Sequence, residues 1–198
     1  AAPSPSDTLL TWYKLVLELV RHTATYSPPV AARAFGYLGV AAYEALASAG
    51  GATSLAGQIS GLTALPARPA GSHDDSLVLH AVMSEAVATF FGNTGPTGQR
   101  AIAAMRDKLG AKLHDGVAED VAARSAAYGL AVARHIEAYS ASDGGHDVQN
   151  MGFPMEWTLQ KGPEFWVPTS LIVQQQAPLL PNWGKNRPFA MPVDKPCT

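Results

Sequence analysis

Apolar residues recur at helical spacing through the first part of the chain. They occupy Leu9, Leu10, Trp12, Tyr13, Val16, Leu17, Leu19 and Val20. Lys14, Glu18 and Arg21 fall on the opposite side, as in an amphipathic helix. Asp7 can cap its N-terminus. The pattern therefore predicts a helix over residues 7–25, preceded by a disordered leader at residues 1–6.

A second apolar run, over residues 27–49, is dense in Ala and Gly, so that other helices can approach its backbone closely. Ser27 can cap it, and a proline fits its first turn. Its charges, Arg33 and Glu44, are eleven residues apart, or roughly 16 Å along a helix axis. They cannot pair with each other, and a buried unpaired charge is costly. We expect this to be the central helix, with Arg33 and Glu44 as structural charges that hold neighbouring segments in register. A catalytic role for either residue is the alternative.

Further helices follow a loop rich in Gly, Ser, Thr and Pro at residues 50–71. Ser72 and Asp75 form a potential capping box for a helix that ends at Gly92-Asn93. A stop–start signal at residues 94–97 then introduces a helix over residues 99–109.

The longest helix is predicted over residues 117–140, and it contains Gly129. An interior glycine costs about 1 kcal/mol relative to alanine. We therefore expect close packing of another backbone against Gly129.

Residues 144–198 have a different character, with eight prolines and three of the four tryptophans of the chain. No sustained period appears, and the segment is aromatic rather than charged, which argues against disorder. The fold class predicted is all-α: a bundle of about five helices over residues 7–143, followed by an irregular Pro/Trp-rich strap. Because its aromatic residues need a surface to cover, we expect the strap to pack on a missing C-terminal half.

Composition narrows the function classes. Hydrophobic residues make up 47% and charged residues 15%, with a net charge of −2 and no basic run, which excludes a nucleic-acid partner. Charges interrupt the longest apolar runs, so no membrane span is predicted. Cys197 has no cysteine partner. The start Ala-Ala-Pro-Ser-Pro-Ser resembles a cleaved end, which favours a periplasmic or secreted protein.

Common catalytic and nucleotide-binding motifs are absent, so no catalytic residue is assigned. His73-Asp74-Asp75 and His146-Asp147 are possible metal ligands, but a helix cap explains the first group, and no metal site is predicted. Trp183, Lys185 and Arg187 lie together in the strap. They are either a packing segment or the wall of an anion pocket for a small-molecule substrate.

Two separated stretches resemble one family. The first carries Ser27-Pro28-Pro29, Arg33 and Tyr43-Glu44-Ala45, and the second joins Phe165-Trp166-Val167-Pro168-Thr169 to Pro181-Asn182-Trp183-Gly184-Lys185-Asn186-Arg187-Pro188-Phe189. Asp143-Gly144 after the long helix also fits. These motifs resemble the bacterial vanadium-dependent haloperoxidases, in the superfamily of type 2 phosphatidic acid phosphatases and bacterial acid phosphatases. Ser170 replaces a proline usual in that pattern.

The resemblance implies an N-terminal helical half. The family holds vanadate or phosphate with K-x6-R-P, P-S-G-H and S-R-x5-H; the last two are absent here, and Lys185-x-Arg187-Pro188 has the wrong spacing for the first. The catalytic groups and the vanadate cofactor are therefore expected only with a C-terminal half beyond Thr198, which would be the partner of this chain. The whole enzyme would oxidise halide with peroxide or hydrolyse phosphate esters. The alternative is a non-enzymatic α-helical binding or scaffold protein.

Overall fold

The computed structural model describes residues 2–145, 157–169, 178 and 180–191. Within these residues it contains helices and no strand. The elements are α1 (Pro5–His22), α2 (Pro28–Ala47), α3 (Asp75–Phe90), α4 (Pro96–His114), α5 (Glu119–Ala141) and the short 3₁₀ helix η1 (Trp183–Lys185). The predicted all-α class is confirmed. His146-Asp147, Ser170 and Cys197 lie outside the described residues.

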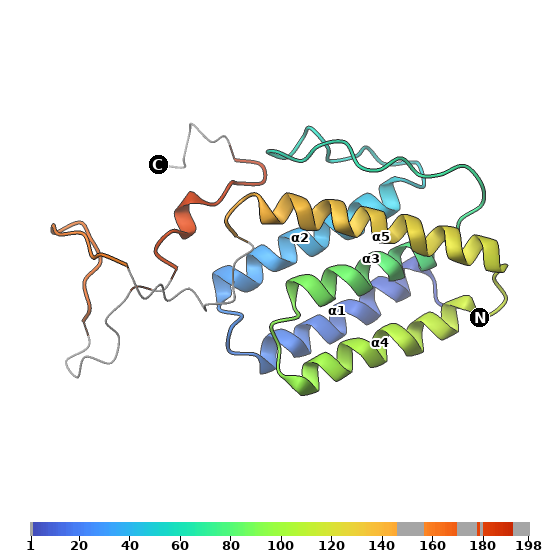
Figure 1. Cartoon of the computed structure of the whole chain (residues 1–198), viewed down its shortest axis with the longest axis horizontal. Helices are drawn as coiled ribbons and strands as arrows, with labels where there is room; N and C mark the ends of the chain where they lie inside the picture. The colour runs from blue at the N-terminus through green and yellow to red at the C-terminus, as the bar shows by residue number, and fades with distance from the viewer. Residues whose placement is uncertain (1, 146–156, 170–177, 179, 192–198) are drawn as a thin grey trace.

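The central helix is α3, which packs against each of the other four helices (Figure 1). Its buried residues lie on all sides of the helix, and include Leu77, Val78, Leu79, Val82 and Met83. A helix that is apolar all round belongs in the middle of a bundle, where every face meets a neighbour. The prediction that the helix of residues 27–49 is central was therefore wrong: α2 packs mainly on α3 and α5.

Helix bounds differ from the prediction at α1 and α3, and α4 extends beyond the predicted residues 99–109 at both ends. Helix α1 begins at Pro5, because the Ser4 side chain accepts from the Asp7 backbone N–H (3.1 Å) and the Asp7 carboxylate accepts from the Ser4 backbone N–H (3.2 Å). This capping box places Pro5 in the first turn, so residues 5 and 6 are helical rather than part of a disordered leader. In α3 the cap is Asp74, not Ser72; its carboxylate accepts from the Leu77 N–H at 2.9 Å.

Helices α3 and α5 pack closely against each other at Gly129. A methyl group at this position would lie 2.4 Å from the carbonyl oxygen of Val78 and 2.7 Å from the Cβ of Ala81. These distances are below van der Waals contact, so only glycine fits without a shift of the backbone. The predicted close packing at Gly129 is confirmed.

The loop between α2 and α3 runs along α5 (Figure 1). The Tyr139 hydroxyl donates to the Ser60 carbonyl oxygen (3.1 Å), and Leu62 is buried in the core. This loop therefore covers the bundle rather than extending away from it.

The strap divides into two parts. Leu180, Trp183 and Phe189 pack against the bundle core of this chain. Residues 157–169 instead project from one end of the bundle (Figure 1) and leave Phe165, Trp166 and Val167 exposed. No helix in the described part of the chain is both long and apolar enough to cross a bilayer.

Candidate functional site

A buried carboxylate, Asp143, lies directly after α5 and joins this helix to α2. The Tyr37 hydroxyl donates to both of its oxygens, at 2.6 and 2.7 Å, and the Arg33 guanidinium forms an ion pair with Oδ2. The Gly145 backbone N–H donates to Oδ1 at 2.8 Å. The interactions with one cation and two neutral donors offset the free-energy cost of removing this fully buried carboxylate from water.

The same network holds the end of the strap. Arg33 also donates to the Arg187 carbonyl oxygen (2.7 Å), and its guanidinium carbon lies 4.2 Å from the centre of the Phe189 ring. The Arg187 backbone N–H donates to the Asp143 carbonyl oxygen at 3.1 Å. We call Arg33, Tyr37, Asp143 and Phe189 the clasp, because together they connect α2, the end of α5 and the strap. The structure thus gives Arg33 the separate partners that a buried charge requires.

Arg187 was predicted to line an anion pocket, but its side chain points to the end of α5. Its guanidinium donates to the Tyr139 carbonyl oxygen (2.9 Å) and to the Ser142 hydroxyl (3.2 Å), and lies 4.5 Å from the Tyr139 ring centre. A cation is favoured at a helix C-terminus because the last carbonyl groups carry partial negative charge. The contacts of Arg187 are therefore those of a residue that fixes the strap on α5.

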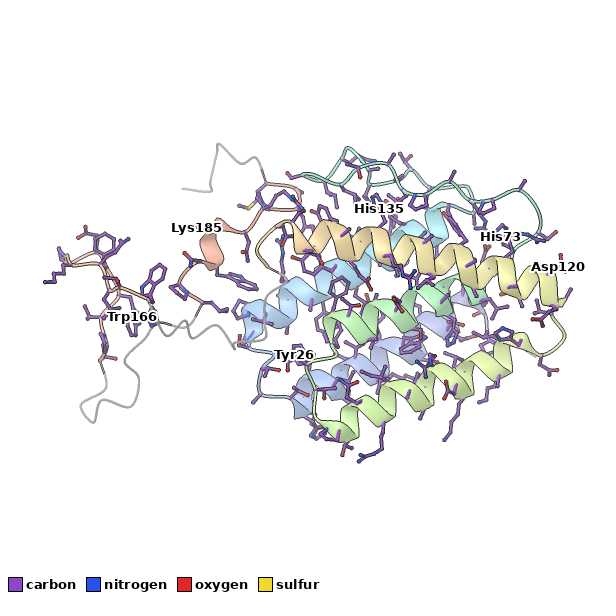
Figure 2. All side chains as sticks on the ribbon, in the orientation of Figure 1. Tyr26, His73, Asp120, His135, Trp166 and Lys185 are labelled. Carbon is purple, nitrogen blue, oxygen red and sulfur yellow. The ribbon has the colours of Figure 1, made fainter. Side chains whose placement is uncertain are left out.

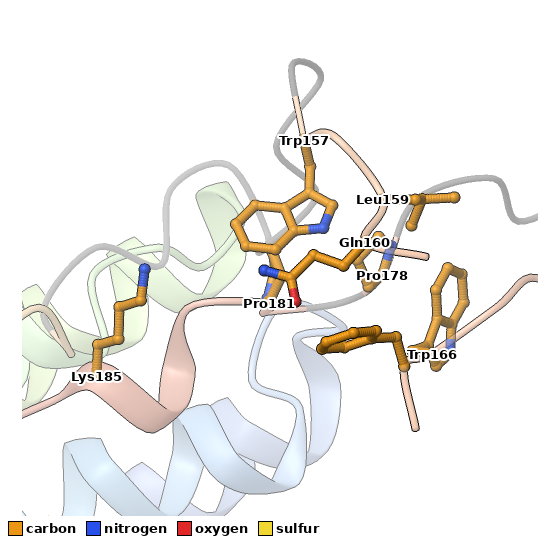
Figure 3. A pocket seen from close by; sticks show the side chains of 8 residues that line it. Trp157, Leu159, Gln160, Trp166, Pro178, Pro181 and Lys185 are labelled. Atoms are coloured by element: carbon orange, nitrogen blue, oxygen red, sulfur yellow. The ribbon is translucent and has the colours of Figure 1, made fainter. Parts of the chain in front are cut away.

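Lys185, at the end of η1, lines a cavity of about 500 Å³ together with residues of the projecting segment 157–169 (Figures 2 and 3). The other lining residues are Trp157, Leu159, Gln160, Phe165, Trp166, Pro178 and Pro181. Trp183, predicted as part of the same wall, is half-buried against the bundle and does not line this cavity. Of the three predicted residues, the structure places only Lys185 there, beside two tryptophans that sequence analysis did not assign to a site.

Glu44 is buried, at 3% exposure, far along α2 from Arg33. Its carboxylate accepts from the Leu55 backbone N–H (2.5 Å) and from the Ser54 hydroxyl (2.9 Å). Both partners belong to the loop between α2 and α3. Glu44 therefore contacts the loop that follows its own helix.

The candidate metal ligands near residue 73 have other partners. The His73 Nδ1 lies 3.0 Å from the Gly71 carbonyl oxygen, Asp74 caps α3, and Asp75 pairs with Arg68 at 2.5 Å. Among the residues that the structure describes, no group of three or more His, Cys, Asp or Glu side chains is placed to hold a metal ion.

A buried histidine, His80, was not singled out by sequence analysis. The Trp12 indole N–H donates to its Nδ1 at 3.2 Å, and burial lowers the pKa of His80 to about 4. The imidazole is therefore neutral at pH 7. The sequence signal for a buried histidine was its place in the middle of an apolar helix, together with a tryptophan in another predicted helix.

The described residues do not fit a vanadate or phosphate ion. An oxyanion with several negative charges requires several cationic or N–H donors directed at one point. Arg33 and Arg187 are engaged with Asp143, Tyr139 and Ser142, and Lys185 is the single cation that lines its cavity. One ammonium group among aromatic rings suits a ligand with one negative charge rather than this ion.

No protein-family model matches the sequence, and no curated protein matches it. Among solved structures, the chain is similar to a bacterial vanadium-dependent iodoperoxidase, with a TM-score of 0.74 and 30% sequence identity. The match covers 95% of this chain and 43% of that chain, so this chain spans less than half the length of the iodoperoxidase. The resemblance to the N-terminal part of a bacterial vanadium-dependent haloperoxidase is confirmed.

Proposed function

We propose that this chain, which has the fold of a bacterial vanadium-dependent haloperoxidase, is the helical N-terminal part of an enzyme that oxidises halide with peroxide. The observation that carries the proposal is the likeness to the iodoperoxidase, which extends over 95% of the chain at 30% identity. Identity at this level together with a shared fold supports common ancestry. The activity of that iodoperoxidase favours halide oxidation over phosphate-ester hydrolysis.

The vanadate and the groups that bind it are proposed to belong to polypeptide outside this chain. This follows from the disagreement between the described residues and the needs of an oxyanion: Arg33 and Arg187 are already engaged, and Lys185 is isolated from them. The C-terminal half of the same protein is the proposed partner. We derive no catalytic step from the residues of this chain.

The contribution of this chain is proposed to be architectural. The bundle supplies a rigid support, and the clasp fixes the strap at the end of α2 and α5. From this attachment the projecting segment 157–169, with Trp157 and Trp166, and the neighbouring Lys185 on η1 would face the partner half or the substrate.

An activity assay tests the proposal. A polypeptide that contains this chain and continues beyond Thr198 is supplied with orthovanadate, hydrogen peroxide and iodide, and triiodide formation is followed by absorbance. We expect oxidation that requires vanadate and is inhibited by inorganic phosphate, which competes for an oxyanion site. Absence of oxidation, with hydrolysis of p-nitrophenyl phosphate in its place, would contradict the peroxidase assignment in favour of a phosphatase. Absence of both activities would favour the non-enzymatic scaffold.

A further inference from the structure

The cavity between the projecting segment 157–169 and the residues before and within η1 combines aromatic walls with one positive charge. Its aromatic members are Trp157, Phe165 and Trp166, and its charged member is Lys185. The volume of about 500 Å³ is that of a small-molecule pocket, for which the usual range is roughly 300–1,000 Å³. Among the residues that the structure describes, no Asp or Glu lines it.

The polar groups of the cavity lie where they can orient a ligand. In Figure 3 the Lys185 ammonium stands at one side and Trp166 at the other, with Trp157 and Gln160 between them. Lys185 is exposed and forms no salt bridge with any acid in the described part of the chain. Its charge is therefore available to an anion that enters from solvent.

The aromatic groups remain partly open to water. Trp166 is 43% exposed and Phe165 is 38% exposed. Flat aromatic ligands favour such rings, because offset stacking covers the ring faces and removes apolar surface from water.

We propose that this cavity binds a flat aromatic anion, such as an aromatic carboxylate, with its rings among Trp157, Phe165 and Trp166 and its acidic group on Lys185. Gln160 supplies an amide that can donate to the same acidic group. The single negative charge matches the single ammonium, which distinguishes this ligand class from vanadate or phosphate. The inference does not rest on the proposed halide oxidation, and either can fail without the other.

Calorimetric titration of the 198-residue chain tests the inference with two probes, 2-naphthoate and its uncharged analogue 2-naphthalenemethanol. We expect 2-naphthoate to bind more tightly than the alcohol, because only the carboxylate can pair with Lys185. Lys185→Gln should weaken 2-naphthoate binding about tenfold and leave the alcohol unchanged. Trp166→Ala should weaken both probes.

Lys161→Gln is the matched control, since Lys161 is an exposed lysine of the same segment that does not line the cavity. It should leave both affinities unchanged. Because Lys185 and Trp166 lie outside α1–α5, the helical circular dichroism of each variant serves as the check of folding. The inference is overturned if 2-naphthoate does not bind, or if Lys185→Gln and Lys161→Gln bind it equally well; the exposed rings would then be a packing surface for another polypeptide.

Discussion

The Tyr37 hydroxyl donates a hydrogen bond to the Asp143 carboxylate, 2.6 Å from its Oδ1, across 106 residues of sequence. The same hydroxyl accepts from the Arg33 Nε at 2.9 Å. Burial and the adjacent carboxylate raise the pKa of Tyr37, so its proton is retained and stays available to Asp143. One tyrosine on α2 therefore connects a cation and an anion that anchor both the end of α5 and the strap.

Removal of the anion from the clasp should be strongly destabilising. In Asp143→Ala, the Arg33 side chain, only 11% exposed, loses its counter-ion, and we expect the free energy of unfolding to fall by about 3–5 kcal/mol. Tyr37→Phe removes one neutral donor and should lower it by about 1–2 kcal/mol. Urea unfolding measures both values.

Asp107→Ala is the control for this pair, because Asp107 forms an exposed ion pair with Arg106. An exposed pair contributes roughly 0–1 kcal/mol. Equal losses in Asp143→Ala and Asp107→Ala would show that the clasp contributes no more than a surface ion pair.

A methyl group on α2 should detach the strap without harm to the bundle. In Gly36→Ala the new Cβ would lie 2.8 Å from the Phe189 ring, so the ring must leave its position beside Arg33. Trypsin cleavage after Lys185 should become roughly tenfold faster, equivalent to about 1.4 kcal/mol of lost docking. In Gly39→Ala the nearest atom is the Tyr13 hydroxyl at 3.9 Å, and cleavage should stay at the wild-type rate. A shared rate for the two variants would mean that Phe189 does not hold the strap.

Gly129→Ala should act on the bundle itself. The new methyl group would meet the Val78 carbonyl at 2.4 Å, which forces α3 and α5 apart, and overpacking of this kind costs about 1–3 kcal/mol. Gly39→Ala again serves as the comparison, because it gains helix propensity of up to about 1 kcal/mol in open space. Thermal unfolding should show a lower melting temperature for Gly129→Ala and a higher one for Gly39→Ala. A gain in stability for Gly129→Ala would refute the close contact.

His80 should make stability fall in acid. Its pKa is about 4 in the folded protein and 6.5 when exposed, so between these values the unfolded chain binds a proton that the folded chain does not. The free energy of unfolding should therefore decrease as the pH falls from about 6.5 to 4, by up to about 3 kcal/mol. Burial is the largest cause of the lowered pKa of His80; the charges of His114 and Arg106 on α4 lower this pKa further, and a hydrogen bond with the Arg106 backbone opposes them.

His80→Gln checks this prediction, because glutamine keeps an acceptor for the Trp12 indole and removes the titrating group. Its urea-unfolding curves should change less between pH 7 and pH 4 than those of the wild type. His22→Gln, which removes an exposed imidazole at the end of α1, is the control. Wild-type pH dependence in His80→Gln would exclude His80 as the source.

Structural features that depend on residues close together in the sequence could be predicted from it. The five helices and the role of Gly129 follow from hydrophobic period, caps and breakers, which act within a few residues. The start of α1 lies before the predicted residue 7, although its signal, Ser4 followed by Asp7 three positions later, is present in the sequence. The all-round apolar pattern of α3 is also a sequence signal for its central place, whereas the small residues of α2 indicate only that other helices can approach closely.

Structural features that depend on contacts between residues far apart in the sequence could not be predicted from it. Arg187 looked like a pocket residue because it lies two positions from Lys185, yet its contacts with Tyr139 and Ser142 direct it to α5. The strap has no period that would predict which of its side chains share a face. Lys185, Trp157 and Trp166 line one cavity only because of how the strap folds, and no local sequence pattern indicates this.

The most direct test of the central proposal is equilibrium dialysis of orthovanadate, at equal protein concentration, against this 198-residue chain and against a polypeptide that extends it beyond Thr198. The proposal that the oxyanion-binding groups lie outside this chain predicts no retention of vanadate by the chain and one equivalent retained by the longer polypeptide. Stoichiometric vanadate binding by the 198-residue chain alone would contradict it.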